Sequence, residues 1–342
     1  MKRNLMSFIC VAVLLCGVLV TQGCMDAHQL EPGTGAQTSF LKNDTPAEEK
    51  AAVRETKSAS EVAADLENIV QTSMSENGID PASVGIVVHD FVTDATCSVN
   101  ADSYFTAAST YKLPLAMLYY EKLAKGSLTA DEGITYGADD YEEGGSIGAS
   151  YLPGDVIPLD TLLNAMILES DNTAGHILSN RLGGWLAFKD AISAYSLRTI
   201  HADDAQYYSY DNVLTAAYMN DVLEHLYNNT DTYEGLIEDL TVARPDDYLN
   251  GTLGGTQMAQ KYGQYEMAEN AVGLSTSGRP YSIVVYTQLG ETGRQWMGAL
   301  NAEIWHYFAT LEKEEGATTN HIEKIATRAS ETVQVEGDAL RS

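Results

Sequence analysis

The sequence predicts a mixed α/β fold in which both strands and helices occupy long parts of the chain. Two β-branched runs of strand length lie far apart, at residues 83–92 and 279–287. Apolar residues at helical spacing occur before, between and after these runs. The chain has 342 residues, 44% of them hydrophobic, which suffices for a core in one large or two ordinary domains.

The charge balance argues against nucleic acid as a partner. The chain carries 20 basic and 48 acidic residues, for a net charge of -28. An acidic surface of this size repels phosphate backbones and anionic membranes. Acidity by itself names no substrate, because it also serves solubility.

The N-terminus predicts export. Lys2 and Arg3 precede an apolar core at residues 6–20, which is short for a membrane span and ends in Thr21-Gln22-Gly23-Cys24. This ending is similar to a bacterial lipoprotein signal, in which Cys24 becomes the lipidated first residue. Thr21 stands where that signal usually has an aliphatic residue, so plain secretion or a retained anchor remain alternatives. We expect a signal at 1–24 and a location at the bacterial cell surface or the periplasmic face of the membrane.

Residues 25–59 are polar, contain prolines and glycines, and predict a flexible tether between the signal and a folded domain.

The positions of the cysteines agree with export but add little to the prediction of function. Two of the four cysteines would leave with the signal and Cys24 would carry lipid. Only Cys97 then remains, so no intramolecular disulfide framework is possible, and its place in an expected strand predicts a small buried hydrophobe.

The domain begins with a helix and two strands. Apolar residues at helical spacing predict a helix over 62–74 that ends at Asn77-Gly78. The strand at 83–92 is followed by a second at 96–100, with a tight turn between them. His89 lies inside the first strand, and we interpret it as structural because nothing nearby completes a catalytic triad with it.

A serine and a lysine stand three positions apart at the start of an apolar run. Ser109 and Lys112 would share one helix face, so the hydroxyl and the amine can meet. Apolar residues up to Leu123 predict a largely buried helix that stops near Gly126. Burial lowers the pKa of an amine, as a proton acceptor requires. A helix cap and a surface charge remain the simpler interpretation of the pair taken alone.

A second polar triplet, Ser170-Asp171-Asn172, interrupts apolar helices on both sides. Before it, residues 134–155 predict a loop, and Asp160 is the expected cap of a helix over 162–168. Asp171 and Asn172 could themselves be helix caps. A serine and an amide at a helix break beside a pocket also suit proton relay and amide recognition.

The C-terminal third predicts two further helices. Apolar spacing indicates one helix over 213–227 and an amphipathic closing helix over 296–311. The tail at 313–342 is charged and polar and receives no assignment. We therefore expect one domain over residues 60–312.

Three motifs follow one another along the chain. Ser109-Thr110-Tyr111-Lys112 precedes Ser170-Asp171-Asn172 by about sixty positions, and Lys261-Tyr262-Gly263 comes before two strand patterns. In order and spacing, these motifs resemble the serine β-lactamase and penicillin-binding-protein superfamily, closest to its class A branch. The resemblance spans roughly residues 61–312, which is most of the chain. It implies an α/β (α+β) fold with an antiparallel five-stranded sheet flanked by helices and an all-helical lobe.

The resemblance implies a role for each matched residue. Ser109 would be the acylated nucleophile, Lys112 its base, and Ser170 the relay of a proton to the leaving nitrogen. The expected substrate-binding residues are Asn172, Lys261, Tyr262, Gly263 and Gln264. Among them, Asn172 would hold a substrate amide and Lys261 would offer positive charge. The backbone N–H groups of Ser109 and Gln264 would form the oxyanion hole.

Two departures from the family pattern bear on activity. Tyr262 stands where the third motif usually has threonine, so either the pocket is narrower there or the ring points away. The loop that usually carries a deacylating glutamate, residues 198–206 here, contains none. Asp203 or Asp204 could substitute, although each is one methylene shorter, and solvated loop acids are the alternative. His201 has no visible partner.

We expect an exported serine hydrolase that forms an acyl-enzyme at Ser109 with β-lactams or peptidoglycan-like peptides and deacylates slowly, with a part in the antibiotic response. The expected protein is a monomer and uses no cofactor and no metal. One alternative is a non-catalytic surface lipoprotein that binds cell-wall peptides on the same scaffold. Another is a lipoprotein whose tether and tail matter more than its pocket. A pure binder has little need of a lysine beside its serine, which favours the enzyme.

Overall fold

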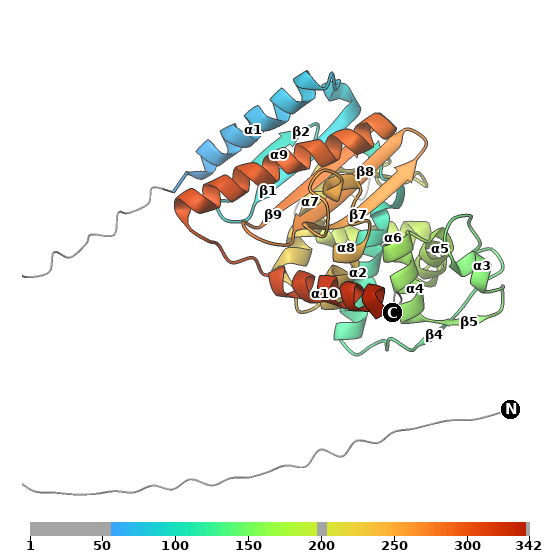
Figure 1. The fold of residues 1–342 in the computed structure, drawn as a ribbon. Coiled ribbons are helices and arrows are strands. Elements are labelled where there is room, and N and C mark those ends of the chain that lie inside the picture. Colours follow the sequence, from blue (N-terminus) through green and yellow to red (C-terminus); the bar gives the residue numbers. More distant parts are fainter. Residues whose placement is uncertain (1–55, 197–203, 340–342) are drawn as a thin grey trace, which may run out of the picture. The chain divides into compact units, whose positions relative to one another are not determined.

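A five-stranded antiparallel sheet lies at the centre of the fold (Figure 1). The structure is a computed structural model and describes residues 56–196 and 204–339. The strand order is β2-β1-β9-β8-β7, and the strands are β1 Val84–Asp90, β2 Ala95–Val99, β7 Met258–Tyr265, β8 Ala268–Ser275 and β9 Tyr281–Thr287. The predicted strands at 83–92, 96–100 and 279–287 are confirmed, and the Lys261 motif lies on the edge strand β7.

Both faces of the sheet are covered, which explains why β1 reads as a continuous apolar run. All seven residues of β1 are buried. Ile86 and Val88 pack into one hydrophobic cluster, whereas Val87 points to the other face and joins a second cluster. Cys97 is buried as predicted, and burial raises the pKa of its thiol to about 11.

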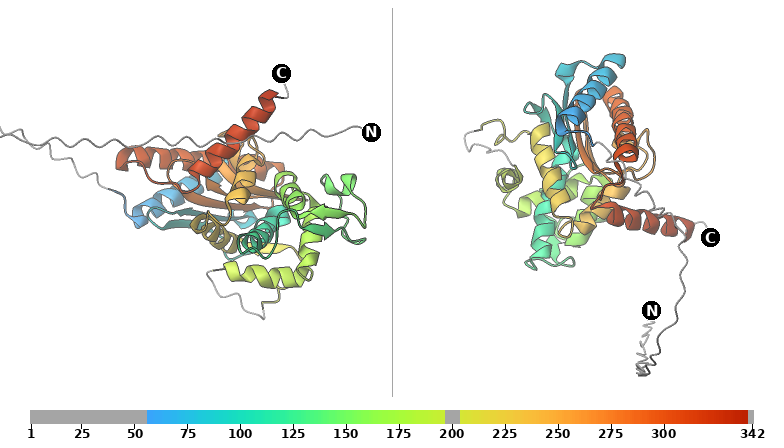
Figure 2. Two further views of the ribbon diagram at one scale, coloured as in Figure 1. Left: turned by 90° about the horizontal axis from the view of Figure 1, so that it is seen from below. Right: turned by 90° about the vertical axis from the view of Figure 1, so that its left-hand side faces the viewer.

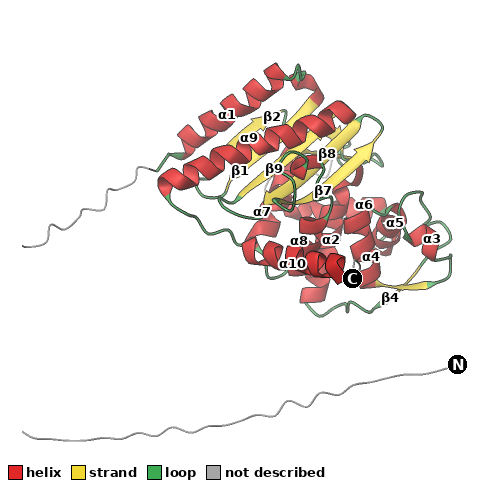
Figure 3. Ribbon diagram, viewed as in Figure 1, coloured by secondary structure: helices red, strands yellow, loops and turns green. Residues whose placement is uncertain are grey.

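Two helices cover the first face. Helix α1 (Ala59–Glu76) and helix α9 (Glu291–Glu315) lie side by side across the strands (Figures 1 and 3). Ser58 begins α1 with a reciprocal capping box to Glu61, and Asn77 ends it. The predictions of helices over 62–74 and 296–311 are therefore confirmed, with longer bounds.

The helices in the middle of the chain form a lobe on the opposite face (Figure 2). They are α2 Lys112–Ala124, α3 Ile147–Ser150, α4 Leu159–Asn164, α5 Asn172–Arg181, α6 Trp185–Ile192, α7 Ala216–Asn228 and α8 Glu234–Val242. Helix α7 packs directly on β1, β8 and β9. Helix α2 lies inside this lobe, and its burial follows from the apolar residues that come after Lys112.

Three local predictions are wrong. The expected loop at 134–155 contains α3 and part of β4 (Gly133–Thr135), which pairs with β5 (Val156–Pro158). The helix expected from residue 213 begins instead with β6 (Val213–Thr215), which pairs with β3 (Tyr104–Thr106). Such short ladders depend on a distant partner rather than on local pattern.

Asp160 is not the N-cap of its helix. Extended Pro158 holds that position, and Asp160 lies in the first turn of α4. Its carboxylate accepts a hydrogen bond from the neighbouring Thr161 N–H instead.

The tail also contains an unpredicted helix, α10 (Glu323–Ala339), which packs on α8. Ile322, Ala326 and Ala329 are buried there, and Arg328 pairs with Glu234 and Glu238 on α8. No helix among the described residues is long and apolar enough to cross a membrane. The predicted signal at 1–24, Cys24 and nearly all of the tether at 25–59 lie outside the described residues.

Candidate active site

Ser109 lies on a strained turn. One turn of 3-10 helix (Ala108–Tyr111) leads into α2, and Ala108 has a φ of 47°, in the left-handed region that side chains disfavour. Asn212 holds this strained backbone through two hydrogen bonds. Its side-chain N–H group donates to the Ala108 carbonyl at 2.7 Å, and its backbone carbonyl accepts from Ala107 N–H at 2.8 Å. Thr110 donates to the Ala107 carbonyl at 2.7 Å. The position of the Ser109 hydroxyl is thus fixed by the chain on both sides of it.

Gly263 allows the third motif to approach this turn. A Cβ atom at position 263 would lie 2.7 Å from the backbone nitrogen of Ser109 and 2.9 Å from that of Thr110. Only glycine permits strand β7 to lie so close to the nucleophile. The next residue, Gln264, lines the cavity beside Ser109.

Lys112 is fully buried and reaches the serine. Its Nζ lies 3.0 Å from Ser109 Oγ, 2.6 Å from the Ser170 carbonyl oxygen and 2.6 Å from Asn172 Oδ1. Burial lowers the pKa of Lys112 to about 7, although the charges of Glu142 and Asp171 oppose the shift. A substantial fraction of this amine is therefore neutral near pH 7 and able to accept the proton of Ser109.

Ser170 joins the two buried lysines. It lies at the break before α5, with a φ of 59°. Its Oγ is 3.0 Å from Lys261 Nζ and 3.4 Å from Lys112 Nζ. A chain of three polar groups thus leads away from Ser109. Asp171, which follows Ser170 in the sequence, caps α5 by accepting a hydrogen bond from Ala174 N–H at 2.7 Å. This confirms the interpretation of Asp171 as a helix cap.

Lys261, the last group of this chain, and the neighbouring Tyr262 are buried and are absent from the residues that line the cavity. The Tyr262 ring stacks on Tyr248 with centroids 5.0 Å apart, and Lys261 Nζ lies 4.0 Å from the Tyr262 centroid. Of the two outcomes expected for Tyr262, the ring points away. Burial lowers the pKa of Lys261 well below its usual value, and the charges of Lys112 and Arg244 lower it further.

Arg244 is a residue that the sequence did not single out. Its guanidinium carbon lies 5.0 Å from the Tyr262 centroid, on a residue whose backbone has a φ of 54°. No motif marks it, because it follows α8 in an irregular segment. Its guanidinium keeps its charge at any physiological pH.

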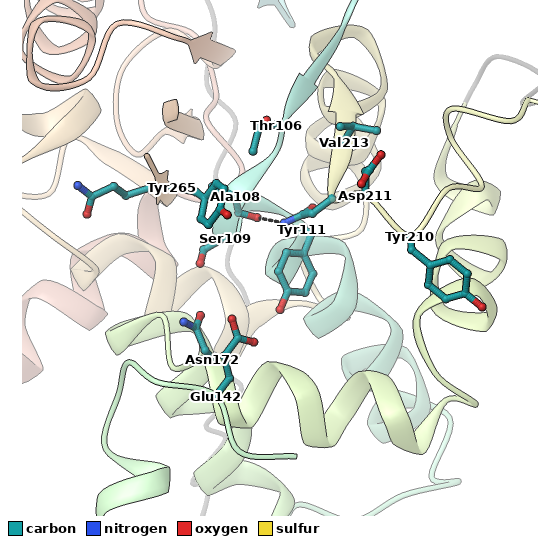
Figure 4. A pocket seen from close by; sticks show the side chains of 12 residues that line it. Thr106, Ala108, Ser109, Tyr111, Glu142, Asn172, Tyr210, Asp211, Val213 and Tyr265 are labelled. Atoms are coloured by element: carbon teal, nitrogen blue, oxygen red, sulfur yellow. Dashed lines mark hydrogen bonds between the residues drawn. The ribbon is translucent and has the colours of Figure 1, made fainter. Parts of the chain in front are cut away.

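A cavity of about 570 Å³ opens beside Ser109 (Figure 4). Its lining residues come from five parts of the chain: Thr106, Ala108, Ser109, Tyr111, Glu142, Asn172, Tyr210, Asp211, Asn212, Val213, Gln264 and Tyr265. The sequence missed both carboxylates, Glu142 and Asp211. Among the described residues, no group of histidine, cysteine and carboxylate side chains is arranged to hold a metal ion.

The loop acid Asp204 does not line the cavity. Tyr104 donates to its carboxylate at 2.6 Å, and the N–H groups of Gln206 and Tyr207 donate to it as well. Burial raises the pKa of Asp204, but these hydrogen bonds outweigh it and hold the pKa below the usual value. Asp204 thus fastens the loop to β3. Asp203 and His201 lie outside the described residues.

His89 does not line the cavity at Ser109, and its Nε2 lies 2.9 Å from the carboxylate of Asp94 in the turn after β1, so it takes no part in this site.

Comparisons with known proteins agree with this geometry. A family model described as Beta-lactamase enzyme family matches residues 61–308. Beta-lactamase VEB-1 of Pseudomonas aeruginosa is 26% identical over 157 residues, which are 43% of this chain and 52% of that protein. The chain thus spans about half the length of this curated relative.

Solved structures share the fold. The TLA-3 extended-spectrum beta-lactamase gives a TM-score of 0.62 at 22% identity, over 72% of this chain and 98% of that one. A mutant of PBP-A, described as an acyl-enzyme complex with penicillin G, gives a TM-score of 0.61 at 17% identity, over 71% and 97%. The predicted fold, with its antiparallel five-stranded sheet and helical lobe, is confirmed.

Proposed function

The chain belongs to the beta-lactamase enzyme family, and from that membership we propose that it is an exported serine hydrolase acylated at Ser109 by β-lactams or peptidoglycan-like peptides, with slow release of the acyl group. The observation that carries the proposal is the buried Lys112 amine, 3.0 Å from the Ser109 hydroxyl and with a pKa lowered to about 7. A binding module would have no use for a nucleophile and base so placed.

Acylation begins when the neutral amine of Lys112 takes the Ser109 proton as Oγ attacks the carbonyl carbon of a lactam or peptide bond. The oxyanion that forms accepts hydrogen bonds from the backbone N–H groups of Ser109 and Gln264. The C–N bond then breaks, and the nitrogen takes a proton from Ser170, which Lys112 replenishes. Ser170 suits this relay because both lysines lie within hydrogen-bonding distance of its Oγ.

Substrate binding is divided among polar groups around the serine. Asn172 offers its amide to the substrate amide on the acyl side. Lys261 acts through its hydrogen bond with Ser170. Gly263 acts through the backbone, because it lets β7 lie close to Ser109. The permanent charge of Arg244, which lies against the Tyr262 ring behind the cavity, adds positive potential for a substrate carboxylate on this side of the serine.

We base slow deacylation on the loop that usually carries the activating glutamate. Hydrolysis of an acyl-serine needs an activated water. The stretch 198–206 has no glutamate, and Asp204 is engaged by Tyr104 outside the cavity.

Intact-protein mass spectrometry after mixing with benzylpenicillin tests the proposal. We expect one stoichiometric adduct that persists for many minutes and is absent in Ser109→Ala. Absence of both an adduct and hydrolysis in the wild type would overturn the proposal, and rapid hydrolysis would overturn slow release alone.

Export and a lipid anchor at Cys24 are part of the proposal and rest on the signal-like pattern of residues 1–24. Membrane fractionation of the full chain beside Cys24→Ala tests them. We expect the variant to leave the membrane fraction as a monomer, and an unchanged distribution would contradict the anchor.

A further inference from the structure

A second cavity adjoins the catalytic one. It measures about 330 Å³ and shares the lining residues Tyr111, Glu142, Tyr210 and Asn212 with the cavity at Ser109. Its other lining residues come from α5 and from the first residue of α6: His176, Ser179, Asn180 and Trp185. A substrate held at Ser109 can therefore extend into it past Asn172.

Glu142 marks the junction of the two cavities. Thr173 at the start of α5 fixes its backbone: the hydroxyl donates to the Glu142 carbonyl at 2.9 Å and accepts from its N–H at 3.1 Å. The side chain remains 48% exposed, with His176 Nε2 3.3 Å from its carboxylate. Figure 4 shows the carboxylate on the same side of the cavity as Asn172.

The walls combine aromatic rings with negative charge. Tyr111 and Trp185 meet edge to face with centroids 5.3 Å apart, and the ring of Tyr210 is 79% exposed. Asp211 adds a second carboxylate to the catalytic cavity. No lysine or arginine is among the described residues that line either cavity.

The basic groups nearby lie behind the walls. Lys112 is buried and bonded to Ser109, Ser170 and Asn172, and Lys189 is buried and donates to the Val213 carbonyl at 2.8 Å. Arg244 also lies behind the walls, against Tyr262 on β7, so the described residues that line the two cavities carry negative formal charge at Glu142 and Asp211. Rings and a carboxylate are the groups that bind an ammonium ion.

We propose that the second cavity is a subsite for an ammonium-bearing group on the acyl side of the substrate, with Glu142 as its counter-ion. The preferred substrates then carry an amine on the acyl side that reaches Glu142. This inference rests on the proposed function, because it assigns the substrate class of the same site.

Two penicillins form a matched pair of probes. Ampicillin differs from benzylpenicillin by one amino group on the acyl side chain. We expect the second-order rate constant of acylation, measured by quenched-flow mass spectrometry, to be about tenfold higher for ampicillin. Glu142→Gln should bring the ratio of the two constants close to one. Asp139→Asn removes the same charge from an exposed position of the same loop outside both cavities and should leave the ratio unchanged.

The outcomes separate the two proposals. Equal constants for both penicillins in the wild type, or a ratio that Glu142→Gln does not lower, overturn the subsite. If neither penicillin forms an adduct, the proposal of acylation at Ser109 is overturned. The subsite is then tested by measuring the equilibrium affinities of both penicillins by calorimetry. A preference for ampicillin that Glu142→Gln removes then supports it, and equal affinities overturn it.

Discussion

The residues on the two sides of Ser109 differ in how deeply they are buried and in which groups they bind. On the side of α2, α5 and β7, Lys112 and Lys261 have no exposed surface and share the hydroxyl of Ser170. On the side of the loop before β6, Tyr210 is 79% exposed and Asp204 is turned toward β3. Attack by serine needs fixed groups with shifted pKa values, and these lie on the first side. The second side shapes the cavity and contributes the carboxylate of Asp211 to it, but its sequence contains no glutamate.

The largest effect is expected from the buried side. Lys112→Ala removes the proton acceptor of Ser109 and should lower the acylation rate constant for benzylpenicillin by about a thousandfold. Mass spectrometry over time measures the rate, and circular dichroism verifies the fold. A loss below tenfold would show that another group takes the proton.

The second largest effect on the acylation rate is expected from a change that pushes β7 away from Ser109. Gly263→Ala would place a Cβ atom 2.7 Å from the Ser109 nitrogen, so the strand and the turn must separate. We expect acylation to slow by about a hundredfold, since the oxyanion donors move apart. Gly235→Ala on α8 is the control, because its nearest neighbour is the Tyr120 ring at 3.3 Å. Equal rates in the two variants would refute a role for close approach.

The pH dependence tests the state of Lys112. Its pKa is lowered to about 7, so the neutral amine that acts as base is lost as pH falls below that value. The acylation rate constant should therefore drop about tenfold per pH unit below 7 and level off above it. Rates between pH 5 and 9 provide the measurement. A profile that is flat from pH 5 to 7 would mean that Lys112 does not titrate in this range.

The smallest effect on chemistry is expected from the loop side. Asp204→Asn weakens hydrogen bonds from Tyr104 and two backbone N–H groups, which should cost about 1–2 kcal/mol of stability. Release of the acyl group should change by less than about threefold, because Asp204 does not line the cavity. Thermal unfolding and the lifetime of the adduct measure the two quantities. A much longer lifetime in the variant would restore Asp204 as a base.

The sequence could predict the parts of the site that depend on local geometry. Ser109 and Lys112 meet because residues three apart share a helix face. The other two polar groups, Ser170 and Lys261, belong to the second and third motifs. The direction of Tyr262 could not be predicted, since it depends on Tyr248 and Arg244 from another segment.

Glu142 escaped notice for a similar reason. Its loop reaches the site through Gly145, where a φ of +114° and the closeness of Asp171 leave no room for a side chain. A hydroxyl on α5 completes its placement. No spacing in the sequence connects these residues, so an acidic loop was all that the pattern indicated.

Helix α10 was missed because its buried face consists largely of alanine, which gives a weak apolar signal. The segment that matches the family ends at residue 308, yet this helix covers α8, the element directly before Arg244 and β7. The unit of homology is therefore shorter than the unit of folding. A chain cut after residue 308 would lose α10 and the end of α9, expose apolar surface on α8 and loosen the segment that carries Arg244.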